Sequence, residues 1–422
     1  MPTAERQPEA PPGSQARSGH LRVLVVHNRY SAATPSGENV SVDHEVEWLR
    51  QAGVDVHLHE TSNDEVLSGS LGAKVRTTAE ITWSPSAAHR FGAVLDRVRP
   101  DLVHVHNLFP LFTASVPWRA VHGHVPVVWT ARNMRVVCVE GTHFRDGARC
   151  TLCRPGWRLP GIRHRCYRGS VGASALVTGA TAIFRRLART SVTSVAISGA
   201  MRTWLVEEAG FDPDRVHLKY NGVAPSGGQA DLPGPEAGTE FLFVGKLAEY
   251  KGVDLLLDAW QRVRHPHASL CIVGDGPMAD RVERGAAAAD SRVRWAGYVP
   301  AAGVADHLAA ARAVVVPSVW DEPFGRVAAE AMAYGRPVIT TGRGGLTEVV
   351  GDAAGWITGT DPAALARAID EAAGSDELVA ARGAAGRARH ARLFSPEATT
   401  AVLVDIYREA IAQAKRRTHH AS

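Results

Sequence analysis

The sequence lacks any long apolar run, which excludes a chain built around membrane-spanning helices. No run approaches the roughly 18 to 20 apolar residues that a transmembrane helix needs. The N-terminus has no apolar segment like the core of a signal peptide, and no internal repeat or coiled-coil heptad recurs along the chain. With 422 residues, 45% of them hydrophobic and 21% charged, the composition predicts a cytoplasmic protein of about two globular domains.

Short apolar runs alternate with helix-like stretches, and this rhythm favours parallel α/β sheets. Residues 1–19 are rich in Pro, Glu, Gln, Ser and Ala, so we expect a disordered tail. A first α/β domain is predicted over 20–222, and the Pro/Gly-rich stretch 223–239 reads as a linker. A second domain is predicted over 240–395, followed by a last helix over 396–416. The predicted strands lie at 21–26, 55–59, 102–106, 125–129, 192–198, 240–245, 269–274, 293–297 and 313–318.

Two carboxylates flank a Phe-Gly turn directly after the last of these strands. Glu322 lies on the turn, and Glu330 follows about two helical turns later. In a parallel α/β sheet, ligands bind beyond the carboxyl ends of the strands, and the N-terminus of the following helix favours anions. Two side chains that only accept hydrogen bonds suit a polyol such as a sugar. On spacing alone, two solvated glutamates on an amphipathic helix are an equal alternative.

The string VVPSVWDEPFGRVAAEAMAYGRPVITTGRGGLTEVVGDAAGW resembles the donor-site signature of the retaining glycosyltransferases of family 4. The resemblance covers about residues 20–412. It implies the GT-B fold: two Rossmann-like domains with the active site in the cleft between them, and a C-terminal helix that crosses back to the first domain. It also implies transfer of a sugar from a UDP- or GDP-sugar to a hydroxyl acceptor (a glycan, a lipid-linked sugar or a small natural product) with retention of anomeric configuration.

The same resemblance assigns the donor-site residues. VGKLAEYKGVDLLLDAW is similar to the family's phosphate-binding segment, so Lys246 and Lys251 are expected to bind the diphosphate, although the family more often has Arg at position 246. Glu322 is expected to contact the sugar and Glu330 the ribose. The remaining expected donor contacts are the backbone of Phe324, Gly325, Arg326 and Val327, the base-binding turn Tyr298 and Val299, and Gly37 on the opposite wall. No Asp-x-Asp motif is placed at this site, and we therefore predict catalysis without a metal or other cofactor.

One position departs from the family pattern. Many members carry a His that contacts the donor sugar where this chain has Arg132, after a predicted strand. Arginine is permanently cationic, so it suits an anionic sugar or acceptor group rather than the role of a neutral imidazole. His104 and His106 also match the family; one is expected to be structural, and His106 is a candidate ligand contact.

A Cys/Arg-rich insertion is predicted over 131–168, near the acceptor cleft. Cys138, Cys150, Cys153 and Cys166 follow the pattern C-x11-C-x2-C-x12-C, and the C-x2-C pair has zinc-ligand spacing. The outer spacings are irregular, so structural thiols or a redox pair remain alternatives to a structural zinc. The insertion is strongly basic and suits an anionic acceptor or peripheral contact with a membrane. Its arginines stand at positions 132, 135, 145, 149, 154, 158, 163, 165 and 168.

Two rival functions fit parts of the sequence. A non-enzymatic scaffold with a basic, zinc-containing module would bind nucleic acid or an anionic membrane. The basic segment has few aromatic residues for base stacking, so we expect no nucleic-acid partner. A GT-B epimerase or phosphorylase would share the fold, but the sequence shows no hydrolytic or phosphorolytic residues for it.

Overall fold

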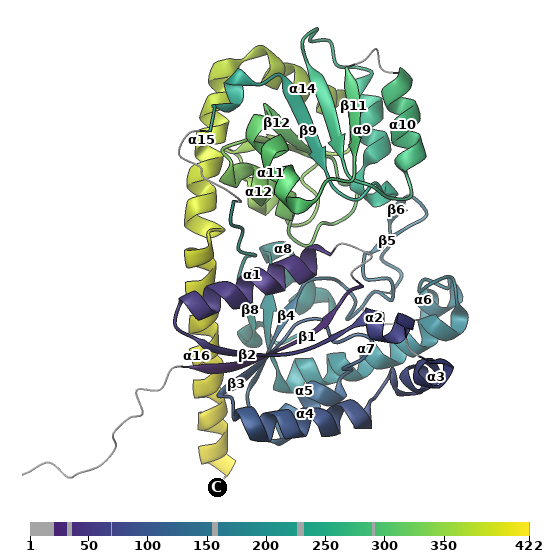
Figure 1. Cartoon of the computed structure of the whole chain (residues 1–422), viewed down its shortest axis with the longest axis vertical. Helices are drawn as coiled ribbons and strands as arrows, with labels where there is room; N and C mark the ends of the chain where they lie inside the picture. The colour runs from purple at the N-terminus through teal and green to yellow at the C-terminus, as the bar shows by residue number, and fades with distance from the viewer. Residues whose placement is uncertain are drawn as a thin grey trace, which may run out of the picture.

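The structure, a computed structural model, describes residues 21–31, 36–68, 70–153, 159–225, 232–288 and 292–421. It consists of two α/β halves stacked along the long axis of the molecule, each built on a six-stranded parallel sheet (Figure 1). The predicted tail 1–19 and part of the predicted linker lie outside the described residues. None of the helices within these ranges combines the length and apolar character needed to cross a bilayer.

The N-terminal sheet has the strand order β2-β1-β3-β4-β7-β8. Its central strands are buried on both faces, which is why they read as near-continuous apolar runs. Its strands are β1 (Arg22–Arg29), β2 (Asp55–Ser62), β3 (Leu102–Val105), β4 (Val127–Ala131), β7 (Thr193–Ala196) and β8 (Val216–Leu218). Its helices are α1 (Gly37–Gln51), α2 (Asn63–Ser68), α3 (Leu71–Glu80), α4 (Pro85–Val98), α5 (Ser115–His122), α6 (Leu159–Arg163), α7 (Val171–Ser191) and α8 (Gly199–Thr203).

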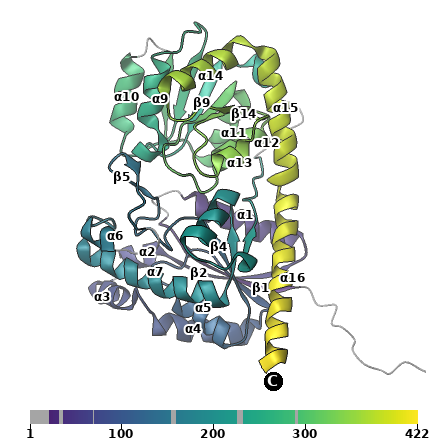
Figure 2. The same cartoon turned by 180° about the vertical axis from the view of Figure 1, so that it is seen from behind.

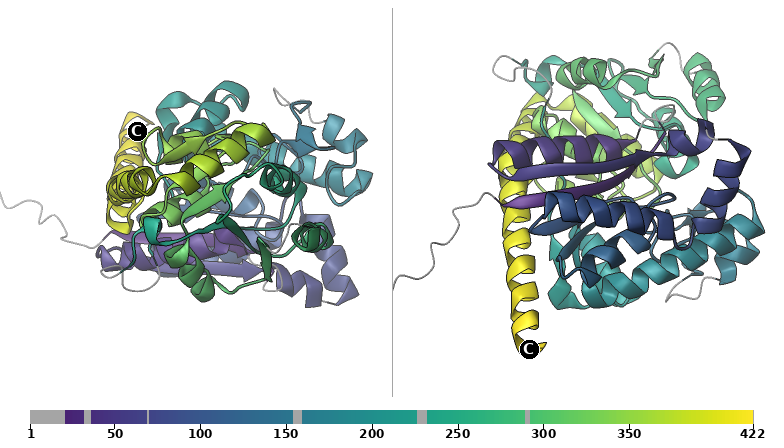
Figure 3. Two further views of the ribbon diagram at one scale, coloured as in Figure 1. Left: turned by 90° about the horizontal axis from the view of Figure 1, so that it is seen from above. Right: turned by 60° about the horizontal axis from the view of Figure 1, so that its bottom comes forward.

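The C-terminal sheet has the order β11-β10-β9-β12-β13-β14. Its strands are β9 (Glu240–Val244), β10 (Ser269–Val273), β11 (Val293–Gly297), β12 (Ala313–Val316), β13 (Val338–Thr340) and β14 (Gly355–Ile357). Its helices are α9 (Val253–Trp260), α10 (Ala279–Ala288), α11 (Ala301–Ala310), α12 (Arg326–Ala333), α13 (Leu346–Val350), α14 (Pro362–Gly374) and α15 (Asp376–Leu393). Figure 3 shows the layering of helices on both sides of the sheets. The predicted fold class is confirmed: two Rossmann-like halves, each with a doubly wound parallel sheet.

Alternate residues of each central strand enter separate cores on the two faces of the sheet. In β1, Leu24 and Val26 join one cluster, whereas Val23 and Val25 join the other. This follows from the two-residue period of a strand. The second cluster also contains Leu403, Ile406 and Tyr407 of α16 (Pro396–Ala421). The long C-terminal helix therefore returns from the second half and packs beside α1 on the N-terminal sheet (Figure 2).

Hydrogen bonds that involve side chains join the two halves of the molecule. The Glu348 carboxylate accepts from the backbone N–H of Gly199 at 2.8 and 2.6 Å and from the Tyr220 hydroxyl at 2.6 Å. The Ser198 hydroxyl donates to the carbonyl of Pro323 at 2.7 Å. These contacts set the turn after β12 directly against the first half.

Candidate active site

The candidate site lies where the C-terminal sheet reverses its winding. Strand β9 pairs with β10 on one side and β12 on the other, so the connections leave it in opposite directions. Ligands of open α/β sheets bind at such a switch point, beyond the carboxyl ends of the strands. Gly245 and Lys246 follow β9 there, and the turn from Ser318 to Glu322 follows β12.

Two loops at this point are tied to each other by their backbones. The Val319 N–H donates to the carbonyl of Tyr250 at 3.0 Å. Gly252 has φ +76°, and a Cβ there would lie 1.9 Å from the carbonyl oxygen of Pro317. Only glycine permits this backbone conformation together with so close an approach. As a result, Lys251 is held beside the turn after β12.

Lys251 and Glu322 form an ion pair in the site. Lys251 Nζ lies 2.6 Å from Glu322 Oε1, and the Ser318 hydroxyl donates to the same oxygen at 2.7 Å. Burial alone would raise the pKa of Glu322, but Lys251 and Ser318 outweigh burial and lower it. The carboxylate is therefore ionised at neutral pH, and the half-buried ammonium keeps donors that can turn toward a ligand.

The start of α12 brings a second ion pair to the same region. Gly325 has φ +98°, and a Cβ there would lie 2.4 Å from Leu346 Cδ2. Arg326 Nε lies 2.7 Å from Glu330 Oε1, and its NH1 donates to the Ser41 hydroxyl of α1 at 2.9 Å. Since a carboxylate offers about four acceptor sites, this pairing leaves Glu330 able to accept from a diol.

The other residues expected to contact the sugar donor differ in their burial and in their neighbours. The Phe324 side chain is buried against Phe394, so only its backbone remains for a ligand, while Val327 packs partly buried against the same core. Gly37 opens α1, and a Cβ there would meet no atom within 4 Å. Tyr298 is 58% exposed at the end of β11, where Val299 packs inward. Strand β11 lies two strands from β9, about 10 Å away at ordinary strand spacing.

On the first half, α1 buries a charge among apolar neighbours. Glu45 lies beside Val42 and Val46 on the inner face of the helix and is 4% exposed. Its carboxylate is bound by the Lys219 ammonium, and Arg132 NH2 lies 3.5 Å from Oε2. Burial would raise the pKa of Glu45, but the two cations prevail and lower it to about 2. Glu45 is thus a buried anion that anchors Arg132.

The two family-like histidines differ in their environments. His104 Nε2 lies 2.8 Å from the Thr130 hydroxyl, and its Nδ1 lies 2.6 Å from the Tyr407 hydroxyl of α16. Both of its ring nitrogens are engaged. His106 Nε2 faces the buried Glu45 carboxylate, 3.4 Å from Oε1, without meeting hydrogen-bond geometry, and His106 Nδ1 has no hydrogen-bond partner among the described residues. Burial lowers the pKa of His106 well below its ordinary value. His106 is therefore neutral, and its Nδ1 keeps its hydrogen-bonding capacity for another group.

Glu45, His104 and His106 place potential metal-ligand atoms within 4.8 Å of one another. The cations Lys219 and Arg132 already neutralise this carboxylate. A metal cation would have to displace or oppose both, so the chemistry of the cluster fits an internal ion network.

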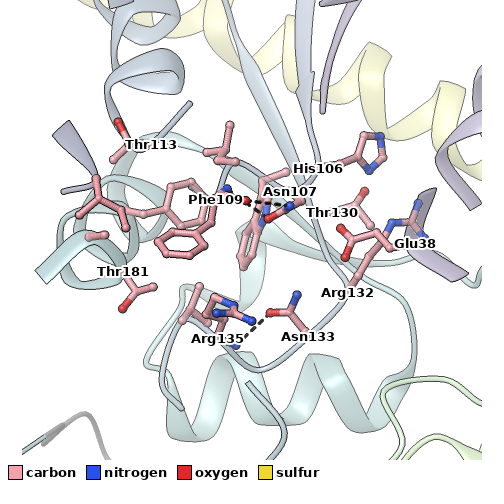
Figure 4. Close-up of a pocket in the computed structure, with 17 residues that line it drawn as sticks. Glu38, His106, Asn107, Phe109, Thr113, Thr130, Arg132, Asn133, Arg135 and Thr181 are labelled. Carbon is pink, nitrogen blue, oxygen red and sulfur yellow. Dashed lines mark hydrogen bonds between the residues drawn. The ribbon is translucent and has the colours of Figure 1, made fainter. Parts of the chain in front are cut away.

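A pocket opens beside this network, with a polar wall and an apolar end (Figure 4). Arg132 NH1 donates to Asn221 Oδ1 at 2.6 Å, and Arg135 stacks 5.6 Å from the ring centres of both Phe109 and Tyr167. Arg132 Nε and Arg135 NH1 are buried without a hydrogen-bond partner among the described residues. The apolar end is formed by Ile81, Leu108, Trp129, Val136, Ala180 and Phe184.

Glu140 of the insertion lies within electrostatic range of both this pocket and the candidate donor site. Burial raises the pKa of Glu140, and both Arg135 of the pocket and Lys246 of the second half are near enough to oppose that shift. Glu38, at the start of α1, also lines the pocket, and burial raises its pKa against the influence of Arg132 and Arg135. Arg132, which stands where the family has a histidine, therefore lines the pocket and is held by Glu45 and Asn221.

The four cysteines of the insertion lie near one another. Burial raises the pKa of the Cys166 thiol, and the neighbouring Cys138, Cys153 and Cys150 raise it further. Among the described residues, however, the groups that bring metal-ligand atoms within 4.8 Å of one another do not include these thiols. This geometry does not support the structural zinc, which stays a prediction. Arg154 and Arg158 lie outside the described residues.

Sequence reasoning missed Glu45 and Lys219, as well as the aromatic residues Tyr250 and Trp320 around Lys251. Lys251 Nζ lies 5.8 and 5.3 Å from the centres of those two rings. A signal for Glu45 was present, because it falls on the apolar face marked by Val42, Val46 and Leu49. Its partner Lys219 follows 174 residues later, and local periodicity carries no information about such a pairing.

Comparison with known proteins identifies glycosyltransferase family models and relatives. Residues 35–226 match the family model described as Glycosyltransferase Family 4, and residues 238–374 match the model described as Glycosyl transferases group 1. The alpha-maltose-1-phosphate synthase of Mycolicibacterium smegmatis is 30% identical over 421 residues, covering 93% of this chain and all of that protein. The D-inositol 3-phosphate glycosyltransferase of a Nocardioides species is 32% identical over 316 residues, covering 65% of this chain and 68% of that protein.

Solved structures share the fold. HepE of Anabaena, solved in complex with UDP and glucose, has a TM-score of 0.64 at 18% identity, covering 92% of this chain and all of that one. The sucrose-phosphate synthase of Thermosynechococcus elongatus has a TM-score of 0.65 at 19% identity, covering 93% of this chain and all of that one. Together, the two model matches and the relatives, one of them nearly full-length, establish that this chain belongs to glycosyltransferase family 4 and is a glycosyltransferase of the GT-B type.

Proposed function

We propose that this enzyme transfers a sugar from a UDP- or GDP-sugar to a hydroxyl acceptor, with retention of anomeric configuration and without a catalytic metal. The observation that carries the proposal is the Lys251–Glu322 pair at the switch point of the second sheet. It sets a cation for a diphosphate beside a carboxylate for sugar hydroxyls. Fixed cations stabilise the negative charge that grows on a departing diphosphate.

In this proposal, Lys251 and Lys246 bind the diphosphate, and the backbone from Phe324 to Val327 contacts the phosphates and the sugar. Glu322 accepts from the sugar hydroxyls, and Glu330 accepts from the ribose diol. Tyr298 and Val299 read the base through their backbone. UDP is the first donor to test, since a solved structure of the same fold holds UDP and glucose.

The chemical step needs no separate base. The acceptor oxygen attacks the anomeric carbon on the face from which the diphosphate departs, and the leaving phosphate oxygen takes the acceptor's proton. The glycosidic bond forms as the bond from the anomeric carbon to phosphate oxygen breaks. The residues of this chain orient the two substrates and hold the charge of the leaving group.

The pocket of the first half is the proposed acceptor site. Arg132 Nε and Arg135 NH1 offer buried donors on its polar wall, and His106 offers a neutral ring. These groups, facing an apolar end, suit an acceptor that has an anionic group as well as an apolar part. The D-inositol 3-phosphate glycosyltransferases among the relatives are named for an acceptor that carries a phosphate. Arg135→Ala should then raise the KM for such an acceptor and leave the KM for the donor unchanged.

Calorimetry of donor binding tests the donor assignment. Wild-type protein should bind UDP, and Glu330→Ala should bind it at least tenfold more weakly because an acceptor for the ribose is lost. This interaction exists in both the ground state and the transition state, so the donor KM should rise more than kcat falls. Glu371→Ala, on α14 away from the site, is the control. Wild-type affinity in Glu330→Ala would refute the ribose role.

The rival scaffold function predicts a different outcome. It requires no turnover of nucleotide sugars, and its binding would follow the basic insertion rather than the residues after β12. Lys251→Ala should then bind UDP as the wild type does, whereas the transferase proposal predicts weaker binding.

A further inference from the structure

The Cys/Arg-rich insertion reaches across to the donor site of the other half. It carries a short antiparallel hairpin of β5 (Phe144–Arg145) and β6 (Ala148–Arg149). Figures 1 and 2 show this hairpin rising from the first half toward the second. Among the described residues, an ion pair between a basic side chain of the insertion and the C-terminal half forms at this hairpin.

Three contacts join the hairpin to the loops of the candidate donor site. Arg149 Nε lies 2.5 Å from Asp321 Oδ2. The Phe144 ring packs edge-on against Tyr250, with 6.3 Å between ring centres. At the hairpin turn, a Cβ on Gly147 would lie 2.9 Å from Glu249 Oε1, so the turn fits closely against that loop.

Each contact reaches a residue within two positions of Lys251 or Glu322. Asp321 directly precedes Glu322, and Tyr250 directly precedes Lys251. Tyr250 also packs on Trp320, with 5.1 Å between ring centres. The hairpin therefore touches both donor loops at once, from a different half of the molecule.

We propose that this hairpin positions the donor site, and that Arg149 is its main positioning residue. The proposal rests on the donor function proposed above and adds a role for the insertion. Arg149 holds the turn before Glu322 and balances the charge of Asp321, which would otherwise stand unpaired beside the incoming diphosphate. Phe144 braces the loop that carries Lys251.

The size of the effect follows from exposure. The side chain of Arg149 is 46% exposed and that of Asp321 is 14% exposed, so water screens the pair in part. Loss of the arginine also leaves a carboxylate that repels the donor's phosphates. Together these effects predict a rise of about fivefold in the dissociation constant for UDP-sugar, with little change in global stability.

The test measures UDP affinity by calorimetry, donor KM and kcat in Arg149→Ala, and the melting temperature of the same protein. Arg145→Ala is the matched control, because Arg145 lies on the same hairpin but pairs with Asp146 of that hairpin at 3.0 Å. Arg149→Ala should raise the dissociation constant and the donor KM about fivefold at an unchanged melting temperature, and Arg149→Lys should recover part of the loss. Arg145→Ala should bind UDP within twofold of the wild type.

A charge exchange separates positioning from simple loss of positive charge. Arg149→Asp should bind UDP more weakly than Arg149→Ala, and Arg149→Asp combined with Asp321→Arg should recover much of that loss. Asp321→Asn gives a second route if the arginine variants fold poorly: in the Asp321→Asn background, Arg149→Ala should have little further effect. Equal affinities in the wild type and Arg149→Ala, equal losses in Arg145→Ala, or no recovery on charge exchange would overturn the proposal. If the wild type itself binds neither UDP nor GDP, the donor function fails instead, so the two failures are distinguishable.

Discussion

Replacing Lys219 by methionine should destabilise the protein strongly, because it removes the cation that binds the buried Glu45. The side chains of Lys219 and Glu45 are 3% and 5% exposed. Breaking a buried ion pair from one side costs about 3 to 5 kcal/mol, because the remaining charge stays buried. The lowered pKa of Glu45, from 4.5 to about 2, corresponds to about 3 kcal/mol of stabilisation of the carboxylate.

Both estimates therefore give a loss of about 3 kcal/mol in the free energy of unfolding at pH 7 for Lys219→Met. The loss is somewhat smaller where Arg132 neutralises part of the Glu45 charge in place of Lys219. Urea denaturation at pH 7 measures it. Because the pKa of Glu45 is lowered on folding, its stabilisation is present above pH 4.5 and is lost as the pH falls toward 2. The difference between the wild type and Lys219→Met should shrink over that window.

Two further variants make the measurement decisive. Adding Glu45→Gln to Lys219→Met removes the stranded charge and should restore a large part of the lost stability. Arg408→Met is the control, since Arg408 pairs with Asp405 on the surface with both side chains more than 70% exposed, and it should change stability by less than about 1 kcal/mol. A Lys219→Met protein as stable as the Arg408→Met protein would refute the reasoning.

Three other predictions follow from the site and the insertion. Burial lowers the pKa of His104 to about 4, so its neutral ring should lower the free energy of unfolding progressively as the pH falls from 6.5 to 4. His104→Gln should reduce this pH dependence by about 1.4 kcal/mol per pH unit. An unchanged pH dependence in urea titrations would contradict this. Lys251→Ala should lower kcat about 100-fold at saturating donor, by analogy with lost oxyanion donors, and wild-type turnover would exclude a role at the transition state. Elemental analysis tests the zinc predicted from the cysteine spacing, which the arrangement of the thiols does not support. About one zinc per chain, lost together with melting temperature in Cys150→Ser, would bear the zinc site out, and metal-free protein of full stability would rule it out.

Much of the fold was predictable because parallel strands buried on both faces appear as apolar runs. The strand 293–297 was predicted with the bounds that β11 has. The hairpin β5–β6 was not predicted, since two-residue strands show no periodicity. The last helix extends to Ala421 rather than ending near 416, because no glycine or proline follows to stop it.

The candidate donor residues could be named from the sequence because they fall in short segments that carry the family's pattern. Their pairing could not. Lys251 and Glu322 are 71 residues apart, and Arg149 and Asp321 are 172 apart in different halves. Such contacts depend on how the two sheets face each other, which no local pattern encodes.

The most direct measurement of the central claim is release of nucleoside diphosphate from UDP-, GDP- and ADP-sugars by the purified protein, followed by NMR of the anomeric configuration of the sugar product. The account predicts that UDP or GDP is released faster than without protein, with retention of configuration. Release should persist after exhaustive EDTA treatment and be lost in Glu322→Gln. Absence of both nucleotide binding and release with all three donor classes would contradict the account.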